Sequence, residues 1–267
     1  MYSSRFVAAA LVVAAQLARA GGPAWEPIAN LEDREAGARA PNTYAPEIFN
    51  GMPTPDYPAV VAVISSFPDD IFGLCTGTLI APAVILTAAH CFNAGPLRVT
   101  VAFVLNGSEV DRAVDALAIH PRYVSSTLNA DAALLRLAQP IEGATPMPLA
   151  RAKPGSGRSG AIVGFGLDGR GKIADRQVGS VHLADCPQSL QHAERLLCWN
   201  SDRGGSNTCD GDSGGPLLVN GRVAGMTSWS RTSGCGPSSL TVDTSVAAVR
   251  RWIRATVGVT GARSSTS

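Results

Sequence analysis

The sequence predicts an all-β protein with one helix at its C-terminal end. Short runs rich in β-branched residues dominate from about residue 48 onward, and turn formers separate them, with 28 Gly and 18 Pro among 267 residues. The chain is 45% hydrophobic, which is enough for a sizeable core. About a dozen short strands suit two antiparallel barrels better than one open sheet. We therefore expect two antiparallel β-barrels followed by a C-terminal α-helix.

The strands are marked by apolar runs and by two hairpin signals. Asn106-Gly107 and Asn220-Gly221 are dipeptides typical of two-residue hairpin turns. Apolar runs flank both of them, and others stand alone. The strands expected on this basis are 59–64, 98–105, 109–119, 160–165, 217–219 and 222–229.

The last expected element is a helix over residues 245–257. Apolar residues recur there at helical spacing, at Val246, Val249, Ile253 and Val257. Ser245 precedes them and is a residue type that caps helix N-termini. We expect residues 258–267 to form a disordered tail.

The first 20 residues have the pattern of a secretory signal peptide. Arg5 supplies a basic start, residues 6–17 are apolar apart from Gln16, and Ala18-Arg19-Ala20 is a small-residue cleavage site. The apolar stretch is too short to span a membrane. We therefore expect export. Residues 21–47 show no apolar periodicity, and we interpret them as a propeptide or flexible lead.

Charge and cysteine content limit the partners and the redox state. The formal net charge of +1 gives no reason to expect binding to nucleic acid or to an anionic membrane. Six cysteines in an exported chain suggest disulfides, although about 15 pairings are possible in principle. No C-x-x-C pair is present, so we expect no metal, and no residue cluster suggests a cofactor.

One glycine-rich stretch, NTCDGDSGGPL, presents a serine that is a candidate nucleophile. A serine hydroxyl is weak at neutral pH, so Ser213 needs a base, and that base needs a group that fixes its tautomer. The chain has four histidines. His90 ends an apolar strand in VILTAAHC and adjoins Cys91. The other three lie in polar or turn-like contexts and are assigned structural roles: His120, His182 and His192.

Among the acidic residues, Asp131 is the candidate partner of this histidine. It opens the apolar strand DAALLRL, and a carboxylate that enters a core needs polar partners. A histidine N–H is such a partner.

The motifs TAAHC, DAALLRL and GDSGGPL, in this order, resemble those of the trypsin/chymotrypsin-like serine proteases. The resemblance covers residues 48–257 and implies two six-stranded β-barrels with the active site between them. It implies that Ser213 is the nucleophile, His90 the general base and Asp131 the residue that orients His90. The N–H groups of Gly211 and Ser213 would form the oxyanion hole. The order His, Asp, Ser also argues against an α/β-hydrolase esterase.

The same resemblance implies disulfides and an activation step. The implied pairs are Cys75–Cys91, Cys186–Cys198 and Cys209–Cys235. Ile48-Phe49-Asn50-Gly51 resembles the N-terminus of a mature family member. Cleavage after Glu47 would free the α-amino group of Ile48, which would pair with Asp212.

The residues implied to form the primary specificity pocket are polar. Asn207 lies six residues before the serine, where trypsin-like members hold an aspartate, so we expect specificity unlike that of trypsin. Thr208 follows it, and Ser228-Trp229-Ser230 resembles one pocket wall, with Ser239 as a candidate for the other. Hydroxyls would narrow the pocket and would suit an acidic or amide side chain, and the alternative is a preference for small or medium neutral side chains. The sequence leaves both options open.

Taken together, these features predict a secreted serine endopeptidase that is made as a zymogen. We expect a monomer that acts on protein or peptide substrates and that protein inhibitors can block. The alternative is a protease-like binding protein that has lost catalysis.

Overall fold

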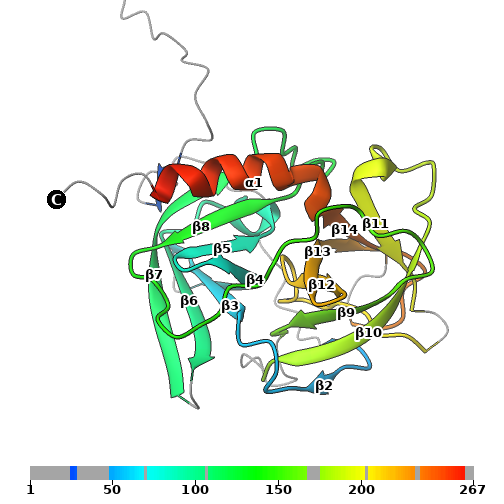
Figure 1. Cartoon of the computed structure of the whole chain (residues 1–267), viewed down its shortest axis with the longest axis horizontal. Coiled ribbons are helices and arrows are strands. Elements are labelled where there is room, and N and C mark those ends of the chain that lie inside the picture. The colour runs from blue at the N-terminus through cyan, green and yellow to red at the C-terminus, as the bar shows by residue number, and fades with distance from the viewer. Residues whose placement is uncertain are drawn as a thin grey trace, which may run out of the picture.

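The computed structural model of the chain describes residues 25–28, 48–68, 71–105, 108–166, 175–201, 204–231 and 235–261. Within these ranges the chain forms two six-stranded antiparallel barrels that lie side by side, with helix α1 along one side of them (Figure 1). The predicted fold class is confirmed. Residues 1–20, where a signal peptide is expected, lie outside the described residues. No helix in the described part of the chain is long and apolar enough to cross a membrane.

The first barrel is closed by one long strand that pairs with both of its neighbours. This strand, β7, pairs with β6 through its first half and with β8 through its second half, with an irregularity in register between Val114 and Ala116. A long strand that changes partner in this way converts an open sheet into a barrel. The six strands are β3 (Val60–Ser66), β4 (Phe72–Ala81), β5 (Val84–Thr87), β6 (Arg98–Leu105), β7 (Ser108–Ile119) and β8 (Ala133–Leu137).

The second barrel is closed by the pairing of β10 with β11. Its hairpin turn at Asn220-Gly221 has φ values of 51° and 68°, as a type I′ turn requires. The other hairpin dipeptide, Asn106-Gly107, lies outside the described residues. The six strands are β9 (Ser159–Gly164), β10 (Gln177–Ala184), β11 (Leu196–Trp199), β12 (Pro216–Val219), β13 (Arg222–Ser230) and β14 (Thr241–Ser245).

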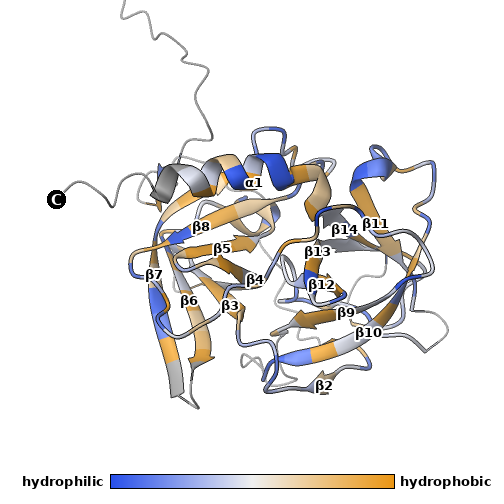
Figure 2. Ribbon diagram, in the orientation of Figure 1, coloured by the Kyte–Doolittle hydropathy of each residue, from blue (hydrophilic) through white to orange (hydrophobic). Residues whose placement is uncertain are grey.

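Several strands are apolar on both faces because the barrels pack against each other. Val61 and Val63 of β3 point into the first barrel, whereas Val60 and Ala62 belong to a second cluster shared with the other barrel and α1. This explains why β3 is a continuous apolar run and does not alternate (Figure 2).

Helix α1 (Val246–Gly261) begins where the sequence indicates and ends later. Its apolar residues join the cluster between the barrels, among them Val246, Val249, Trp252 and Ile253. The prediction that residues from 258 onward are disordered is wrong up to Gly261, because Gly258 weakens a helix by only about 1 kcal/mol and does not end this one. The expected cap is also wrong, since Ser245 Oγ is buried without a hydrogen-bond partner.

Two short strands precede the first barrel, and each joins a different barrel. β2 (Met52–Pro53) pairs with β10 of the second barrel. β1 (Glu26–Pro27) pairs with β7 of the first. The interpretation of residues 21–47 as a flexible lead is therefore wrong for residues 25–28, because Ile28 is buried in the first-barrel core. Short 3₁₀ turns cover Ala89–Phe92 and Ala193–Arg195.

Candidate active site

His90 and Asp131 are brought together by the ends of two paired strands. His90 lies in the 3₁₀ turn after β5, and Asp131 lies just before β8, the neighbour of β5. Nδ1 of His90 is 2.7 Å from Oδ2 of Asp131, and the backbone N–H of His90 donates to Oδ1 at 2.9 Å. The carboxylate thus fixes both the ring and the backbone of the histidine.

Asp131 is fully buried and has a third donor. Ser228 Oγ donates to Oδ2 of Asp131 at 2.6 Å. Hydrogen bonds to a carboxylate favour its ionised form, and a buried charge without partners would be unstable. Ser228 was predicted as a pocket residue only; its contact with Asp131 was missed, because the two residues are 97 positions apart in sequence.

Ser213 lies next to this pair through its backbone. Its carbonyl accepts a hydrogen bond from the N–H of Thr76 at 2.8 Å, and Sγ of Cys91, the residue after His90, is 3.9 Å from the same carbonyl. Among the described residues, no hydrogen bond joins Ser213 Oγ to His90. Such bonds are often long in the absence of substrate and tighten when substrate binds.

The loop around Ser213 has a conformation that only glycine adopts readily. Gly211 has φ of +97° and Gly214 has φ of +79°. The carbonyl of Gly211 accepts a hydrogen bond from Thr76 Oγ1 at 2.8 Å. The same hydroxyl accepts from the N–H of Phe165 at 3.1 Å, so one threonine of the first barrel holds two loops of the second.

Asp212 and the segment that begins at Ile48 are both buried in the second barrel. The carboxylate of Asp212 accepts the N–H of Cys209 at 2.8 Å and that of Gly166 at 3.2 Å. Ile48 is 3% exposed and packs in the core of the second barrel. Phe49 exchanges two backbone hydrogen bonds with Asn207, at 2.8 and 3.1 Å. The predicted activation segment is therefore bonded directly to the predicted pocket.

The side chain of Asn207 is engaged on both sides and cannot be reached by solvent. Its Nδ2 donates to the Gly236 carbonyl at 2.9 Å, and its Oδ1 accepts from Thr241 Oγ1 at 2.5 Å. Asn207 and Thr241 are each 0% exposed.

The hydroxyl of Ser230, a predicted pocket residue, lies beside the hydroxyl of Thr241. Ser230 of β13 is paired with Thr241 of β14, and their hydroxyl oxygens are 3.4 Å apart. Ser230 Oγ donates to Ser238 Oγ at 2.8 Å. Ser239, the expected second wall residue, is exposed, and Thr241 takes that position. The register across the insert at 236–238 could not be read from the sequence.

The remaining predicted pocket residues differ in their contacts. Thr208 is buried beside Asn207. Trp229 is partly buried and packs on a small cluster that includes Cys198, Leu240 and Val242.

Asp243 is a buried acid that sequence reasoning missed. It lies two residues after Thr241 on β14, and so on the same strand face, and its carboxylate oxygens have no hydrogen-bond partner. Burial raises the pKa of Asp243 well above its usual value. Burial without a hydrogen-bond partner therefore favours the uncharged form of this carboxyl group.

The three cysteine pairs implied by the family resemblance are all present. Cys75–Cys91 joins the segment of His90 to β4, with an S–S length of 2.07 Å. Cys186–Cys198 and Cys209–Cys235 are the other two. Cys75, His90 and Cys91 lie as close as metal ligands do, but a disulfide leaves no thiolate to bind a metal.

His120 has the structural role that its context indicated. It is buried, its ring meets Trp252 edge-on at 5.0 Å, and its Nδ1 accepts the N–H of Arg122 at 3.2 Å. Burial, with a smaller contribution from Arg122, lowers the pKa of His120 to about 4. The ring is therefore neutral at neutral pH.

Comparison with known proteins agrees with this geometry. The family model described as Trypsin matches residues 48–253. Brachyurin of Leptuca pugilator is 33% identical over 73% of this chain and 92% of its own length. Trypsin of Saccharopolyspora erythraea is 30% identical over 65% of this chain and 82% of its own length.

Two further matches are more limited in what they support. Serine protease 56 of Homo sapiens is 32% identical over 71% of this chain, which spans only 36% of that protein. A solved structure titled "Structure of GrC" has a TM-score of 0.67 and covers 78% of this chain and 99% of its own. At 22% identity, that likeness concerns the fold alone.

Proposed function

The chain belongs to the trypsin family of serine proteases, and we propose that it is a secreted endopeptidase that cleaves peptide bonds through an acyl-enzyme on Ser213. The observation that carries this proposal is the anchoring of His90 by the buried Asp131, beside the loop that holds Ser213. The alternative, an inactive protease-like binding protein, has no support among the relatives, and all three residues are retained.

The proposed chemistry follows from which nitrogen of His90 is engaged. Because Nδ1 donates to Asp131, Nε2 carries the free lone pair and is the base for the Ser213 hydroxyl. Attack of Ser213 Oγ on the scissile carbonyl transfers its proton to His90, which then protonates the leaving amine. Asp131 stabilises the imidazolium that forms in between. Water then attacks the acyl-enzyme by the same route.

The developing oxyanion would be bound by the N–H groups of Gly211 and Ser213. The positive φ of Gly211 supports this assignment, because a side chain there would be strained and would meet Gly166 and Leu74. The carbonyl of Gly211 accepts a hydrogen bond from Thr76, which restrains the peptide between Gly211 and Asp212.

Activation is proposed to occur by cleavage before Ile48. The new α-amino group, with an ordinary pKa of about 8, would be largely cationic at neutral pH and would pair with Asp212. The burial of Ile48 and the two hydrogen bonds between Phe49 and Asn207 support this step. They connect the new N-terminus to the loop that leads to Ser213.

For the residue before the scissile bond, we propose a preference for small neutral side chains. An acidic side chain needs donors or a cation. The hydroxyl hydrogens of Thr241 and Ser230 are already donated, to Asn207 and to Ser238. An Arg or Lys side chain would find no counter-charge at the base of the pocket, since Asn207 is neutral and inaccessible. Glu47 is then a poor site for self-cleavage, which favours activation by another protease.

A panel of peptide substrates tests this function. Material cleaved before Ile48 is assayed on peptides that differ only in the residue before the scissile bond, with Ser213→Ala and the exposed Ser126→Ala as paired variants. We expect Ala and Ser peptides to be cleaved fastest, Ser126→Ala to match the wild type and Ser213→Ala to be inactive. Fastest cleavage after Arg, Lys or Glu would refute the proposed specificity, and activity in Ser213→Ala would refute the mechanism.

A further inference from the structure

The lead segment adds a strand to the first barrel at a site where β7 would otherwise have an open edge. Glu26 pairs with Leu117 and Pro27 with Ala116. β8 already pairs with the same two residues of β7, so β1 lies along the opposite edge. β6 occupies that edge only as far as Ala113. β1 therefore continues the sheet where β6 leaves it, and Pro27 is suited to the outermost strand because it has no N–H to donate.

Side chains on both sides of β1 fix it to the barrel. Ile28 is only 6% exposed and is a member of the first-barrel core. Trp25 is partly buried, and the guanidinium of Arg136 lies 5.6 Å from the centre of its ring. Arg136 is itself held by Asp115, at 2.7 Å. Four residues thus supply an added strand, a buried aliphatic anchor and a cation–π contact.

These four residues lie before the proposed cleavage site. The 19 residues 29–47 connect Ile28 to Ile48. The first cysteine of the chain is Cys75, so no disulfide can link residues 21–47 to the rest of the chain. After cleavage, only non-covalent contacts could retain the lead segment.

We propose that the activated enzyme consists of two chains, in which the lead peptide ending at Glu47 stays bound to the first barrel through Trp25–Ile28. This inference rests on the activation step proposed above. The retained strand covers the β7 edge and completes the core with Ile28, so it is a part of the mature protein.

The test uses the full chain after cleavage before Ile48. Native mass spectrometry should show a one-to-one complex of lead peptide and protease, and denaturing mass spectrometry should show the two chains separately. Ile28→Asp should increase loss of the peptide at least tenfold, whereas Ile28→Val, which keeps an aliphatic side chain, should retain it. N-terminal sequencing reports the cut independently.

The outcomes separate the two proposals. An N-terminus of IFNG with no peptide in the native complex of the wild type overturns peptide retention and leaves activation standing. Fully active protein that is uncut before Ile48 overturns both. Equal retention in wild type and Ile28→Asp overturns the role assigned to β1. The wild-type measurement decides retention even if Ile28→Asp fails to fold.

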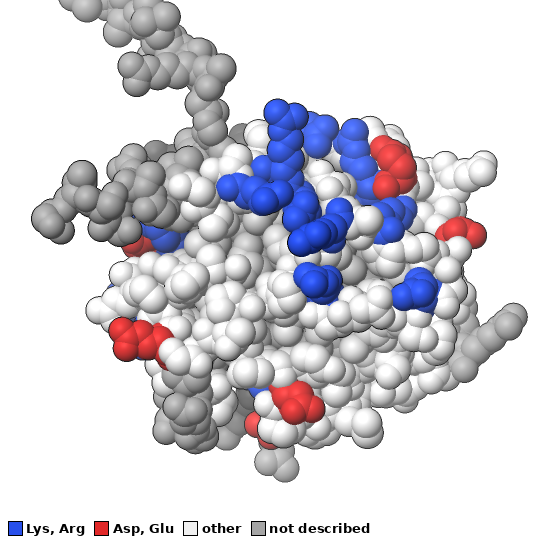
Figure 3. Space-filling view, in the orientation of Figure 1, with Lys and Arg blue, Asp and Glu red and all other residues white. Residues whose placement is uncertain are grey.

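A separate observation concerns charge. Lys and Arg side chains cluster on the face of the molecule that carries α1, and acidic residues lie at the edges of this basic cluster (Figure 3). What we term the arginine face consists of the arginines that line a pocket there, Arg151, Arg158 and Arg222, and the arginines of α1, Arg250, Arg251 and Arg254. In the described part of the chain none of the six forms an ion pair, whereas Arg136 pairs with Asp115 and Arg195 with Glu194. The small net charge of the chain conceals this asymmetry.

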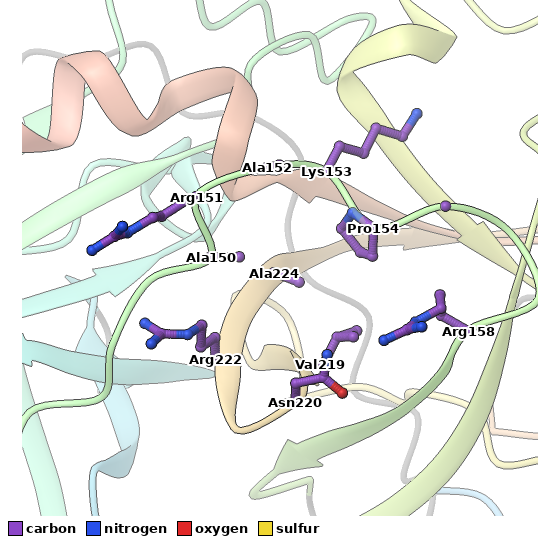
Figure 4. Close-up of a pocket in the computed structure, with 11 residues that line it drawn as sticks. Ala150, Arg151, Ala152, Lys153, Pro154, Arg158, Val219, Asn220, Arg222 and Ala224 are labelled. Atoms are coloured by element: carbon purple, nitrogen blue, oxygen red, sulfur yellow. The ribbon is translucent and has the colours of Figure 1, made fainter.

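A shallow pocket of about 400 Å³ lies within this face, between residues 150–158 and the β12–β13 hairpin. Figure 4 shows Arg158 on one side of the pocket and Arg151 and Arg222 on the other. Lys153 extends away from it, with Nζ bonded to the carbonyls of Ala193 and Glu194 at 3.0 and 3.4 Å. None of the residues lining the pocket is acidic or aromatic.

We infer that the arginine face binds a linear sulfated polysaccharide. Guanidinium groups bind sulfate in a bidentate manner, and cations spread over a loop, a hairpin and a helix match repeated anionic groups better than one ion. Single-stranded nucleic acid binding relies on aromatic side chains that stack on bases, and this pocket has none.

Binding to heparin, measured against salt concentration, tests this inference on the full chain. We expect Arg158→Gln/Arg222→Gln and Arg250→Gln/Arg254→Gln each to weaken binding about tenfold and to reduce the salt dependence. Arg98→Gln on β6 is the matched control and should change binding less than twofold. The assignment would be contradicted if Arg98→Gln weakened heparin binding as much as the double variants do. It would also be contradicted if single-stranded DNA of matched charge bound as tightly as heparin.

Discussion

Thr241 Oγ1 donates a hydrogen bond to Asn207 Oδ1 at 2.5 Å, and both residues are inaccessible to solvent. This bond joins β14 to Asn207, the residue proposed to lie at the base of the specificity pocket. Because Asn207 is also bonded to Phe49 through its backbone, the pocket base and the activation segment form one connected unit. The proposed specificity pocket and the proposed activation segment are thus linked by hydrogen bonds in the second barrel.

Removing the facing hydroxyls should open the pocket. In Ser230→Gly/Thr241→Gly, the two side chains that meet across it are gone, so larger apolar side chains gain space. We expect the ratio of kcat/KM for a Leu peptide to that for an Ala peptide to rise at least tenfold, as read from the same peptide panel. An unchanged ratio would show that these residues do not limit the pocket.

Ser228→Ala should slow catalysis without weakening substrate binding. The variant removes one donor to the buried carboxylate of Asp131, and hydrogen bonds to charged groups contribute about 1.5–3 kcal/mol. We expect kcat to fall about 10- to 100-fold with KM changed less than twofold. Steady-state kinetics beside Ser126→Ala measure this. A rise in KM at constant kcat would instead indicate a role in the pocket alone.

Asp243→Asn should make the protein more stable at neutral and alkaline pH. Because burial raises the folded-state pKa of Asp243, the unfolded chain ionises first and stability falls as pH rises above about 4. This decline, of about 1.4 kcal/mol per pH unit, continues until the folded-state pKa is reached. Urea unfolding at several pH values should show that the free energy of unfolding declines less with rising pH in the variant than in the wild type. Parallel pH profiles for the two proteins would contradict this account.

His120→Phe should protect the fold against acid. The folded-state pKa of about 4 lies below the ordinary 6.5, so the unfolded chain takes up a proton first as pH falls. The contribution of His120 to the free energy of unfolding is therefore fully present above pH 6.5. It declines by about 3 kcal/mol as the pH falls toward 4. Phe keeps the edge contact with Trp252 and does not titrate. The wild-type Tm should drop more steeply over this range than that of the variant.

The sequence predicted the elements whose signals are local. The β12–β13 hairpin was indicated by Asn220-Gly221, whose two positive φ values a type I′ turn needs. The helix was indicated by its apolar spacing, although it continues to Gly261, beyond the last residue of that pattern at Val257. The strand pairs that close the barrels are not local, so they came from the family resemblance.

Contacts between distant residues were the ones missed. Ser228 and Asp131 meet only because the two barrels pack together. Thr241 replaced Ser239 as the wall residue because the register of β14 against β13 depends on pairing across a loop. Residues 25–28 lack periodicity, and their docking depends on an edge of β7 that the sequence does not reveal.

Covalent labelling of Ser213 tests the central claim most directly. Protein cleaved before Ile48 is treated with a fluorophosphonate, which reacts with activated serines, and the modified residue is located by peptide mass spectrometry. The account predicts stoichiometric modification of Ser213 alone, strongly reduced in Asp131→Asn and absent in Ser213→Ala. Labelling at another serine, or none at Ser213 in correctly cleaved protein, would contradict it.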